Sequence, residues 1–171
     1  MNEFQERLQS LLVEKNLNRL QLAKAINVTS TTINGYFNKN YYPQIDIAIK
    51  IADYFNCSLD FLFGFSNDES NKNTNNKPFM ENFNTLLKQS NLSISKAMKE
   101  FEMSEYNYYR WKKGLFPKTI NLLEIVKYFD TSLDYLVGNK FYVYGKDKND
   151  VTRFSFTEVE PYVPTIFNGA E

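Results

Sequence analysis

The strongest constraint on the fold of this chain is that its sequence repeats itself. The segment SLDFLFG at residues 58–64 recurs as SLDYLVG at residues 132–138, and the dipeptide YF at 54–55 recurs at 128–129. These matches are separated by 74 residues, and matching apolar positions upstream are separated by 75 residues. Matches that continue along a whole segment at nearly constant spacing predict two copies of one structural module.

The repeat divides the chain into four parts. The predicted first domain spans residues 1–65, and the predicted second domain spans residues 79–140. Residues 66–78 between them are polar and have no apolar period, which is typical of a flexible linker. The C-terminal part, 141–171, contains the β-branched and aromatic runs FYVY and VTRFSF, which predict a small β-hairpin followed by an irregular tail.

Each copy is predicted to contain about five short helices, so the predicted fold class is all-α apart from the hairpin. In the first copy, Phe4, Leu8, Leu11 and Leu12 share one face of a first helix. We expect the carboxylate of Asp60 to lie near the positive end of the short helix that it begins. The predicted N-caps are Asn18, Thr29 and Ser58 in the first copy and Ser93, Ser104 and Ser132 in the second.

Composition excludes several classes of function. The 171 residues contain no histidine and one cysteine, Cys57, so His-activated nucleophiles, disulfides and multi-cysteine zinc sites are excluded. The sequence has no Gly-rich phosphate loop and no carboxylate pair with catalytic spacing, and we therefore expect no enzyme activity, cofactor or metal. The lone cysteine and the lack of a long apolar stretch are typical of a soluble cytoplasmic protein without a membrane partner.

Residues 18–43 contain the motif that points to a function. Two capped helices, separated by a tight turn at Ile26–Val28, are followed by a loop that ends at Pro43. Together with the following IKIADYFNCSLDFLFG, this segment closely resembles the phage-repressor-like (XRE, lambda-repressor-like) family of helix-turn-helix transcription regulators. The resemblance covers residues 1–64 strongly and 79–138 recognisably. It implies a compact five-helix domain whose third helix enters the major groove of DNA.

The resemblance also assigns roles to residues. The apolar positions of the two helices would pack between them, namely Leu22, Ala23, Ile26, Val28, Ile33 and Tyr36. The outward positions of the third helix are short and polar, which suits hydrogen bonds to base edges. Taken as ordinary surface residues, Ser30 and Thr31 are first-turn residues of a helix, and Arg19 is a solvated charge. The predicted DNA-binding residues are Arg19, Ser30, Thr31, Asn34, Gly35, Asn38, Lys39 and Asn40.

The second copy differs at the positions that would face DNA. Tyr108 and Trp111 replace core residues of the first copy, and Met98 stands where the first copy has Ala23. The outward positions are bulkier and more charged, which suits either a DNA groove or a protein interface. This possible second DNA or protein surface consists of Glu105, Tyr106, Tyr109, Arg110, Lys112 and Lys113.

The predicted function is sequence-specific binding of double-stranded DNA by a transcriptional regulator. The resemblance implies a repressor of a bacterial, phage or mobile-element operon. Because the chain has 20 basic and 20 acidic residues, binding has to depend on local polar contacts rather than on a basic field. The alternative is a protein-interaction module in which the second helix-turn-helix copy and the hairpin bind a protein partner.

Two uses of the copies are compatible with the sequence. In one, a single chain engages two DNA half-sites with its own two copies. In the other, the first copy binds DNA while the second copy and the hairpin form a homodimer or bind a protein effector or inducer. The different outward residues of the two copies argue against a symmetric site for one chain, and on that ground the sequence favours the second arrangement.

Overall fold

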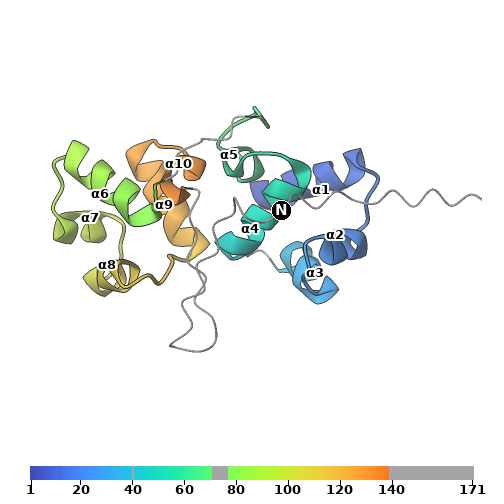
Figure 1. Cartoon of the computed structure of the whole chain (residues 1–171), viewed down its shortest axis with the longest axis horizontal. Helices are drawn as coiled ribbons and strands as arrows, with labels where there is room; N and C mark the ends of the chain where they lie inside the picture. The colour runs from blue at the N-terminus through green and yellow to red at the C-terminus, as the bar shows by residue number, and fades with distance from the viewer. Residues whose placement is uncertain (40, 71–76, 139–171) are drawn as a thin grey trace, which may run out of the picture.

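The computed structural model describes residues 1–39, 41–70 and 77–138, which form ten α-helices in two consecutive groups of five (Figure 1). The first five-helix group consists of α1 (Glu3–Glu14), α2 (Arg19–Ala25), α3 (Ser30–Asn38), α4 (Ile45–Phe55) and α5 (Leu59–Leu62). The second five-helix group consists of α6 (Phe79–Gln89), α7 (Ile94–Glu100), α8 (Glu105–Lys112), α9 (Thr119–Phe129) and α10 (Leu133–Val137).

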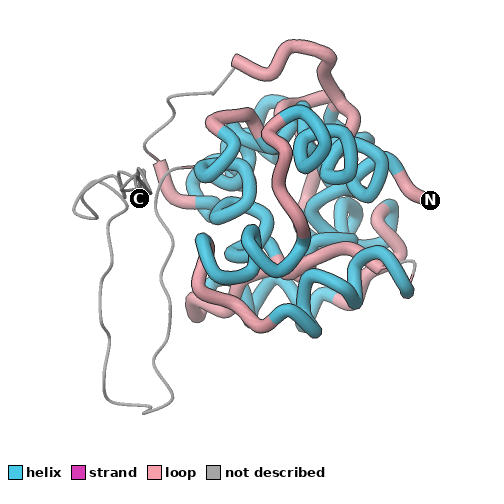
Figure 2. Tube along the Cα trace, turned by 90° about the vertical axis from the view of Figure 1, so that its right-hand side faces the viewer, coloured by secondary structure: helices cyan, strands magenta, loops and turns pink. Residues whose placement is uncertain are grey.

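The described part of the chain is all-α, because its residues form helices and loops and no strand (Figure 2). The hairpin and tail predicted at 141–171 lie outside the described residues, as do Asn40 and residues 71–76 of the predicted linker. No helix in the described ranges is both long enough and apolar enough to cross a membrane. The same ranges contain no cluster of three or more His, Cys, Asp or Glu side chains that could hold a metal ion.

Side-chain caps determine where most of these helices begin, because the first N–H groups of a helix have no partner within it. Asn18 forms a full capping box with Gln21, and Asn2 forms the same arrangement with Gln5. The other predicted caps each accept a hydrogen bond from a backbone N–H of the first turn, which confirms the prediction at Thr29, Ser58, Ser93, Ser104 and Ser132.

Each five-helix group packs around its own aromatic residues. In the first group Phe4 is completely buried, and its ring lies 5.9 Å from that of Tyr36 and 5.3 Å from that of Phe63. In the second group Phe83 is completely buried and lies 5.8 Å from the Trp111 ring. Burial of such large side chains supplies most of the stability that holds the short helices together.

The backbone follows a similar path in both groups. Helices α1 and α5 contact each other as α6 and α10 do, and α2 contacts α3 as α7 contacts α8. Eight of the nine described residues with positive φ form four pairs, each separated by 74 or 75 positions in the sequence, and the ninth is Gly114. The pairs are Asn16 and Asn91, Asn27 and Glu102, Asn56 and Asp130, and Gly64 and Gly138.

The two groups meet through reciprocal hydrogen bonds between α5 and α10. The Asp134 carboxylate accepts from the backbone N–H groups of Leu59 at 3.1 Å and Asp60 at 2.9 Å. In return, the Asp60 carboxylate accepts from the backbone N–H of Leu133 at 2.6 Å and from the Ser132 hydroxyl. Each aspartate therefore lies at the N-terminus of the short helix in the other group. We call these bonds the reciprocal SLD contact.

Asp60 lies in the first turn of α5, as predicted. Its carboxylate has a second role that the sequence did not indicate, because its oxygens accept hydrogen bonds at the start of α10, and the residue is only 9% exposed. Burial raises the pKa of the Asp134 carboxyl to about 6, and the neighbouring Asp60 carboxyl acts in the same direction, whereas the two backbone N–H donors lower it.

A second bond joins the two groups at the start of α4 and α9. The buried Thr119 hydroxyl donates to the backbone carbonyl of Pro43 at 2.6 Å. Thr119 is the first residue of α9, and Pro43 lies two residues before α4. The N-termini of α4 and α9 are therefore neighbours in the middle of the molecule.

Candidate nucleic-acid interface

A tight turn sets the angle between α2 and α3. The turn residue Asn27 has a left-handed backbone with φ of 55°, and the Val28 N–H donates to the Ala23 carbonyl at 2.9 Å. Asparagine adopts this conformation more readily than most residues. Thr29 then caps α3, and its hydroxyl oxygen lies 3.1 Å from the Thr32 amide nitrogen.

The inner side of α3 packs against α2. Ala23 is 1% exposed and Ile33 is completely buried, so the two helices approach closely at a small side chain, as predicted. Tyr36 is 3% exposed, and burial raises the pKa of its hydroxyl to about 12. Val28, which was predicted to share this core, is only half-buried and packs at its edge.

The predicted base-contacting residues differ in their exposure to solvent. Thr31 is exposed, whereas Ser30 and Asn34 are half-buried on the flanks of α3. Asn38 and Lys39 are exposed at the C-terminal end of the helix, and Asn40 lies outside the described residues. The structure thus brings Ser30, Thr31 and Asn34 together on one helix, with Asn38 and Lys39 at its end.

Gly35 has a packing role that the sequence did not indicate. A Cβ atom placed on Gly35 would lie 2.3 Å from the Tyr41 hydroxyl oxygen, which covers this position. The Tyr41 ring also stands edge-on to that of Tyr36, with 5.7 Å between the centroids. Gly35 therefore gives space to Tyr41, and its assignment as a DNA-binding residue stays a prediction.

Arg19 connects the start of α2 to the end of α3. Its guanidinium carbon lies 3.8 Å from the centroid of the Phe37 ring, which is a close cation–π contact. The side chain is half-buried, so it is held more firmly than a freely solvated charge. This contact places a positive group beside the outer end of the helix-turn-helix, where a phosphate could be bound.

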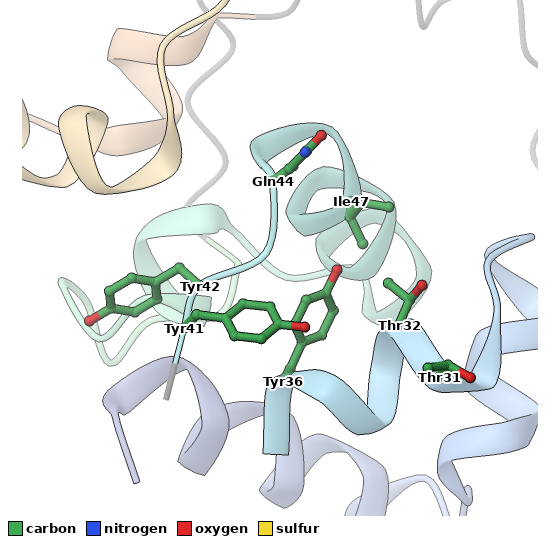
Figure 3. A pocket seen from close by; sticks show the side chains of 7 residues that line it. All are labelled: Thr31, Thr32, Tyr36, Tyr41, Tyr42, Gln44 and Ile47. Carbon is green, nitrogen blue, oxygen red and sulfur yellow. The ribbon is translucent and has the colours of Figure 1, made fainter. Parts of the chain in front are cut away.

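An open depression of about 620 Å³ lies between α3 and the start of α4 (Figure 3). The hydroxyls of Thr31 and Thr32 and the amide of Gln44 lie at its edge. Thr32 and Gln44 also line it, and neither was predicted from the sequence as a site residue. Gln44 is the exposed N-cap residue of α4, and its side chain forms no capping hydrogen bond. Its place directly after Pro43 could have indicated such a helix start. The depression is lined by Thr31, Thr32, Tyr36, Tyr41, Tyr42, Gln44 and Ile47.

The corresponding helix of the second group, α8, carries larger and more charged residues. Tyr106 is 68% exposed and Tyr109 is 51% exposed, and the Arg110 guanidinium lies 5.9 Å from the centroid of the Tyr106 ring. Glu105 and Lys112 are exposed on the same helix, and Lys113 is exposed at its C-cap. All six residues of the predicted second surface are therefore grouped on α8 and its cap.

The inner side of α8 agrees with prediction. Tyr108 is 7% exposed and Trp111 is 4% exposed, and both contact the Phe83 ring. Met98 is completely buried between these helices, in the position that Ala23 has in the first group. A larger residue therefore fills the space where α7 and α8 cross.

Comparison with known proteins points to one family. The family described as "Helix-turn-helix" matches residues 8–62, which include α2, the turn and α3. The chain is 35% identical over 62 residues to an uncharacterized HTH-type transcriptional regulator of Rickettsia prowazekii (strain Madrid E), a match that covers 34% of this chain and 67% of that protein. A similar regulator of Rickettsia conorii (strain ATCC VR-613 / Malish 7) is also 35% identical over 62 residues, with 57% of its length covered. No solved structure matches the chain significantly.

Proposed function

The chain belongs to the helix-turn-helix family of DNA-binding transcription regulators, and on that premise we propose that α3 reads the sequence of double-stranded DNA and that binding represses transcription. The observation that supports the reading role is that α3 has a buried apolar side and an outer polar side. Its inner side is fixed by Ile33 and Tyr36, while its outer side carries short donors and acceptors. Side chains of that kind on a rigid helix can form paired hydrogen bonds with base edges.

The remaining predicted residues would contact the DNA backbone. Asn38 ends α3 and Lys39 follows it, both on the surface, and the Arg19 guanidinium lies over the ring of the neighbouring Phe37. Contacts to phosphates position a helix in the groove without reading sequence. Because residues 1–64 contain six basic and six acidic side chains, these few local contacts have to replace a general basic field.

The decisive experiment removes the reading groups while leaving the fold intact. In the variant Thr31→Ala with Asn34→Ala, we expect specific DNA binding to weaken by at least about 30-fold, since each of the two lost base contacts costs about 1–3 kcal/mol. A binding site is first selected from random duplex DNA with the wild-type chain. Affinities for that site and for unrelated DNA are then measured by fluorescence anisotropy.

The matched control is Gln9→Ala with Ser10→Ala, which truncates two polar residues on α1, outside the helix-turn-helix. Both variants should keep the wild-type circular dichroism spectrum. If Thr31→Ala with Asn34→Ala retained the full preference for the selected site, α3 would not be the reading helix.

Repression is the finer part of the proposal. A reporter gene placed behind the selected site should be silenced by the wild-type chain and not by the α3 variant. Increased expression would indicate activation and contradict the repressor role. Dimerisation stays a prediction, and sedimentation of the free chain and of the chain on its site tests it.

A second candidate function follows from the exposed tyrosines of α8. Tyr106 and Tyr109 present large aromatic surfaces of the kind that protein interfaces use. In this alternative the second five-helix group binds a protein effector or inducer, or a second copy of the chain. A salt titration separates the two functions, because DNA binding weakens steeply with added salt and an apolar protein contact does not.

A further inference from the structure

We infer that one chain is a complete two-site DNA reader, in which α3 and α8 bind two neighbouring half-sites of different sequence on the same duplex. The inference rests on the proposed function and extends it to the second five-helix group. It selects DNA, rather than a protein, as the partner of α8. In this inference, contacts within one chain fix the distance between the two reading helices.

The first step is the way the two groups are joined. In the reciprocal SLD contact, the Asp60 and Asp134 carboxylates each accept hydrogen bonds at the N-terminus of the other group's helix. Such charge-assisted bonds are stronger than neutral ones, and the positive end of each short helix favours the carboxylate. One bond of each pair corresponds in the two directions, since the Leu59 N–H donates to Asp134 as the Leu133 N–H donates to Asp60. The second donor differs, because it is the Asp60 N–H in one direction and the Ser132 hydroxyl in the other. The contact thus relates the two groups approximately as two copies of a protein are related about a two-fold axis.

The second step is the surface between the two reading helices. The Thr119–Pro43 bond brings the starts of α4 and α9 together, so Gln44 and Lys118, which immediately precede these helices, lie near each other. Both are exposed N-cap residues whose side chains form no capping hydrogen bond. The first turn of α4 contains the Asp46 carboxylate, whereas that of α9 has no acidic residue. In the middle of the molecule, Lys118 and the N-terminus of α9 are therefore the groups suited to bind a DNA phosphate between two half-sites.

The third step is the position of the two reading helices in the molecule. In Figure 1, α3 and α8 lie along the same lower edge of the molecule at its two ends, whereas α5 and α10 meet above them. Two helices at opposite ends of one edge can enter successive major grooves on one side of a duplex. Helix-turn-helix pairs that do so bind half-sites about one helical turn apart, or about 10 base pairs.

The fourth step is the chemistry of α8. Arg110, Lys112 and Lys113 are exposed on it or at its cap, and Lys118 precedes α9 nearby, so cations outnumber the single carboxylate of Glu105. Arginine is the residue that most often reads guanine, and a tyrosine can contact bases or phosphates. Because α3 carries Ser, Thr and Asn at the matching positions, the two half-sites must differ in sequence.

The test begins with selection of binding sites from random duplex DNA by the full chain. We expect two short conserved blocks of different sequence, about 10 base pairs apart between centres, bound by one chain as measured by native mass spectrometry. A single block would leave the proposed function intact and overturn this inference. A palindromic site bound by two chains would also overturn it. Failure to select any sequence would contradict the proposed function itself.

A change in the DNA tests the fixed spacing without any variant protein. Insertion of about 5 base pairs between the blocks turns the second block to the opposite side of the helix. Wild-type affinity should then fall by about 100-fold, because the second contact is no longer intramolecular. Unchanged affinity would show that the two groups move independently or that only one of them reads DNA.

A matched pair of variants tests α8 directly. Arg110→Ala with Lys112→Ala should weaken binding to the full site by at least about tenfold, reduce the slope of log K against log salt by about one to two, and abolish selection of the second block alone. The control, Lys88→Ala with Lys127→Ala, removes the same charge from α6 and α9 and should bind as wild type. If both variants behave alike, or if the α8 variant loses only capture of a protein partner, α8 is not a DNA reader.

The last variant addresses the reciprocal SLD contact. Asp60→Ala with Asp134→Ala removes both carboxylates, and the chain should then bind the normal site and the site with the insertion within about threefold of each other. Circular dichroism monitors whether the helices persist in this variant. Asp130→Asn, at an exposed aspartate outside the contact, is the control and should retain the wild-type preference for the normal spacing. Retention of that preference by the double alanine variant would exclude the contact as the source of the spacing.

Discussion

At the scale of single residues, the left-handed positions show where side-chain type and backbone agree and where they conflict. Asn16, Asn27, Asn56 and Asn91 have φ angles between 51° and 55°, and asparagine tolerates this region well. Glu102 occupies the position equivalent to Asn27 with φ of 54°, although glutamate has no local hydrogen bond that favours it there. The turn between α7 and α8 therefore contains a strained residue that the turn between α2 and α3 lacks.

Replacement of Glu102 by asparagine should stabilise the protein. We expect Glu102→Asn to raise the free energy of unfolding by about 0.5–1 kcal/mol, since the left-handed backbone costs a glutamate roughly 1 kcal/mol more than an asparagine. Urea denaturation measures the change. Glu100→Asn, which makes the same substitution at the exposed end of α7, serves as the control and should give no gain. An equal response of the two variants would mean that strain at position 102 is negligible.

Single residues also show the limits of sequence-based assignment. Gly35 is on the outward side of α3 by helical periodicity, yet the Tyr41 hydroxyl covers it. Periodicity assigns a residue to one side of its own helix, but it contains no information on a loop residue six positions later that folds back. Of the positions predicted to face solvent, Thr31 is exposed, whereas Asn34 is half-buried.

At the scale of elements, helix starts were the most predictable feature of this chain. A Ser, Thr or Asn before an apolar period provides the acceptor that the first N–H groups need, and six predicted caps form in the structure. The packing of α2 against α3 followed from the same local pattern. The reciprocal SLD contact could not be predicted in this way, because its partners are 72 to 75 residues apart and Asp60 has an equally plausible local role.

Removal of the α3 cap tests how strongly this element depends on one hydroxyl. Thr29→Ala should lower the free energy of unfolding by about 1 kcal/mol and weaken DNA binding modestly, because the first turn of α3, which carries Ser30 and Thr31, loses its bond to the cap. Urea denaturation and anisotropy measure the two effects. Thr29→Ser keeps the hydroxyl and should retain both properties. If Thr29→Ser were as destabilising as Thr29→Ala, the methyl group and not the cap would be responsible.

At the scale of the whole molecule, the reciprocal SLD contact should make stability depend on pH. The pKa of Asp134 is about 6 in the folded chain, above the ordinary value of 3.8, because the carboxyl is buried and faces Asp60. The folded state then binds a proton more tightly than the unfolded state, so this group stabilises the fold at low pH and loses that contribution as pH rises through about 6. The effect opposes the usual behaviour of an ion-paired aspartate.

We expect unfolding free energy to fall by on the order of 1 kcal/mol from this group between about pH 5 and pH 7. Denaturation across that range should show the decline in wild type and a flatter profile in Asp134→Asn, whose amide does not titrate. Asp130→Asn, an exposed aspartate at the end of α9, should keep the wild-type profile. A wild-type profile in Asp134→Asn would assign the pH dependence to other groups.

The reciprocal SLD contact also affects which substitutions the chain can accept in evolution. Each SLD segment binds the other, so a substitution in one segment changes the contact for both five-helix groups. The segments 58–60 and 132–134 are identical, whereas all four outward positions of α3 differ from their counterparts on α8. If α3 and α8 both read DNA as proposed, their outward residues can diverge separately because they lie in one chain, which is not possible in an oligomer of identical subunits. The DNA site can then become asymmetric while the residues of the reciprocal SLD contact stay the same.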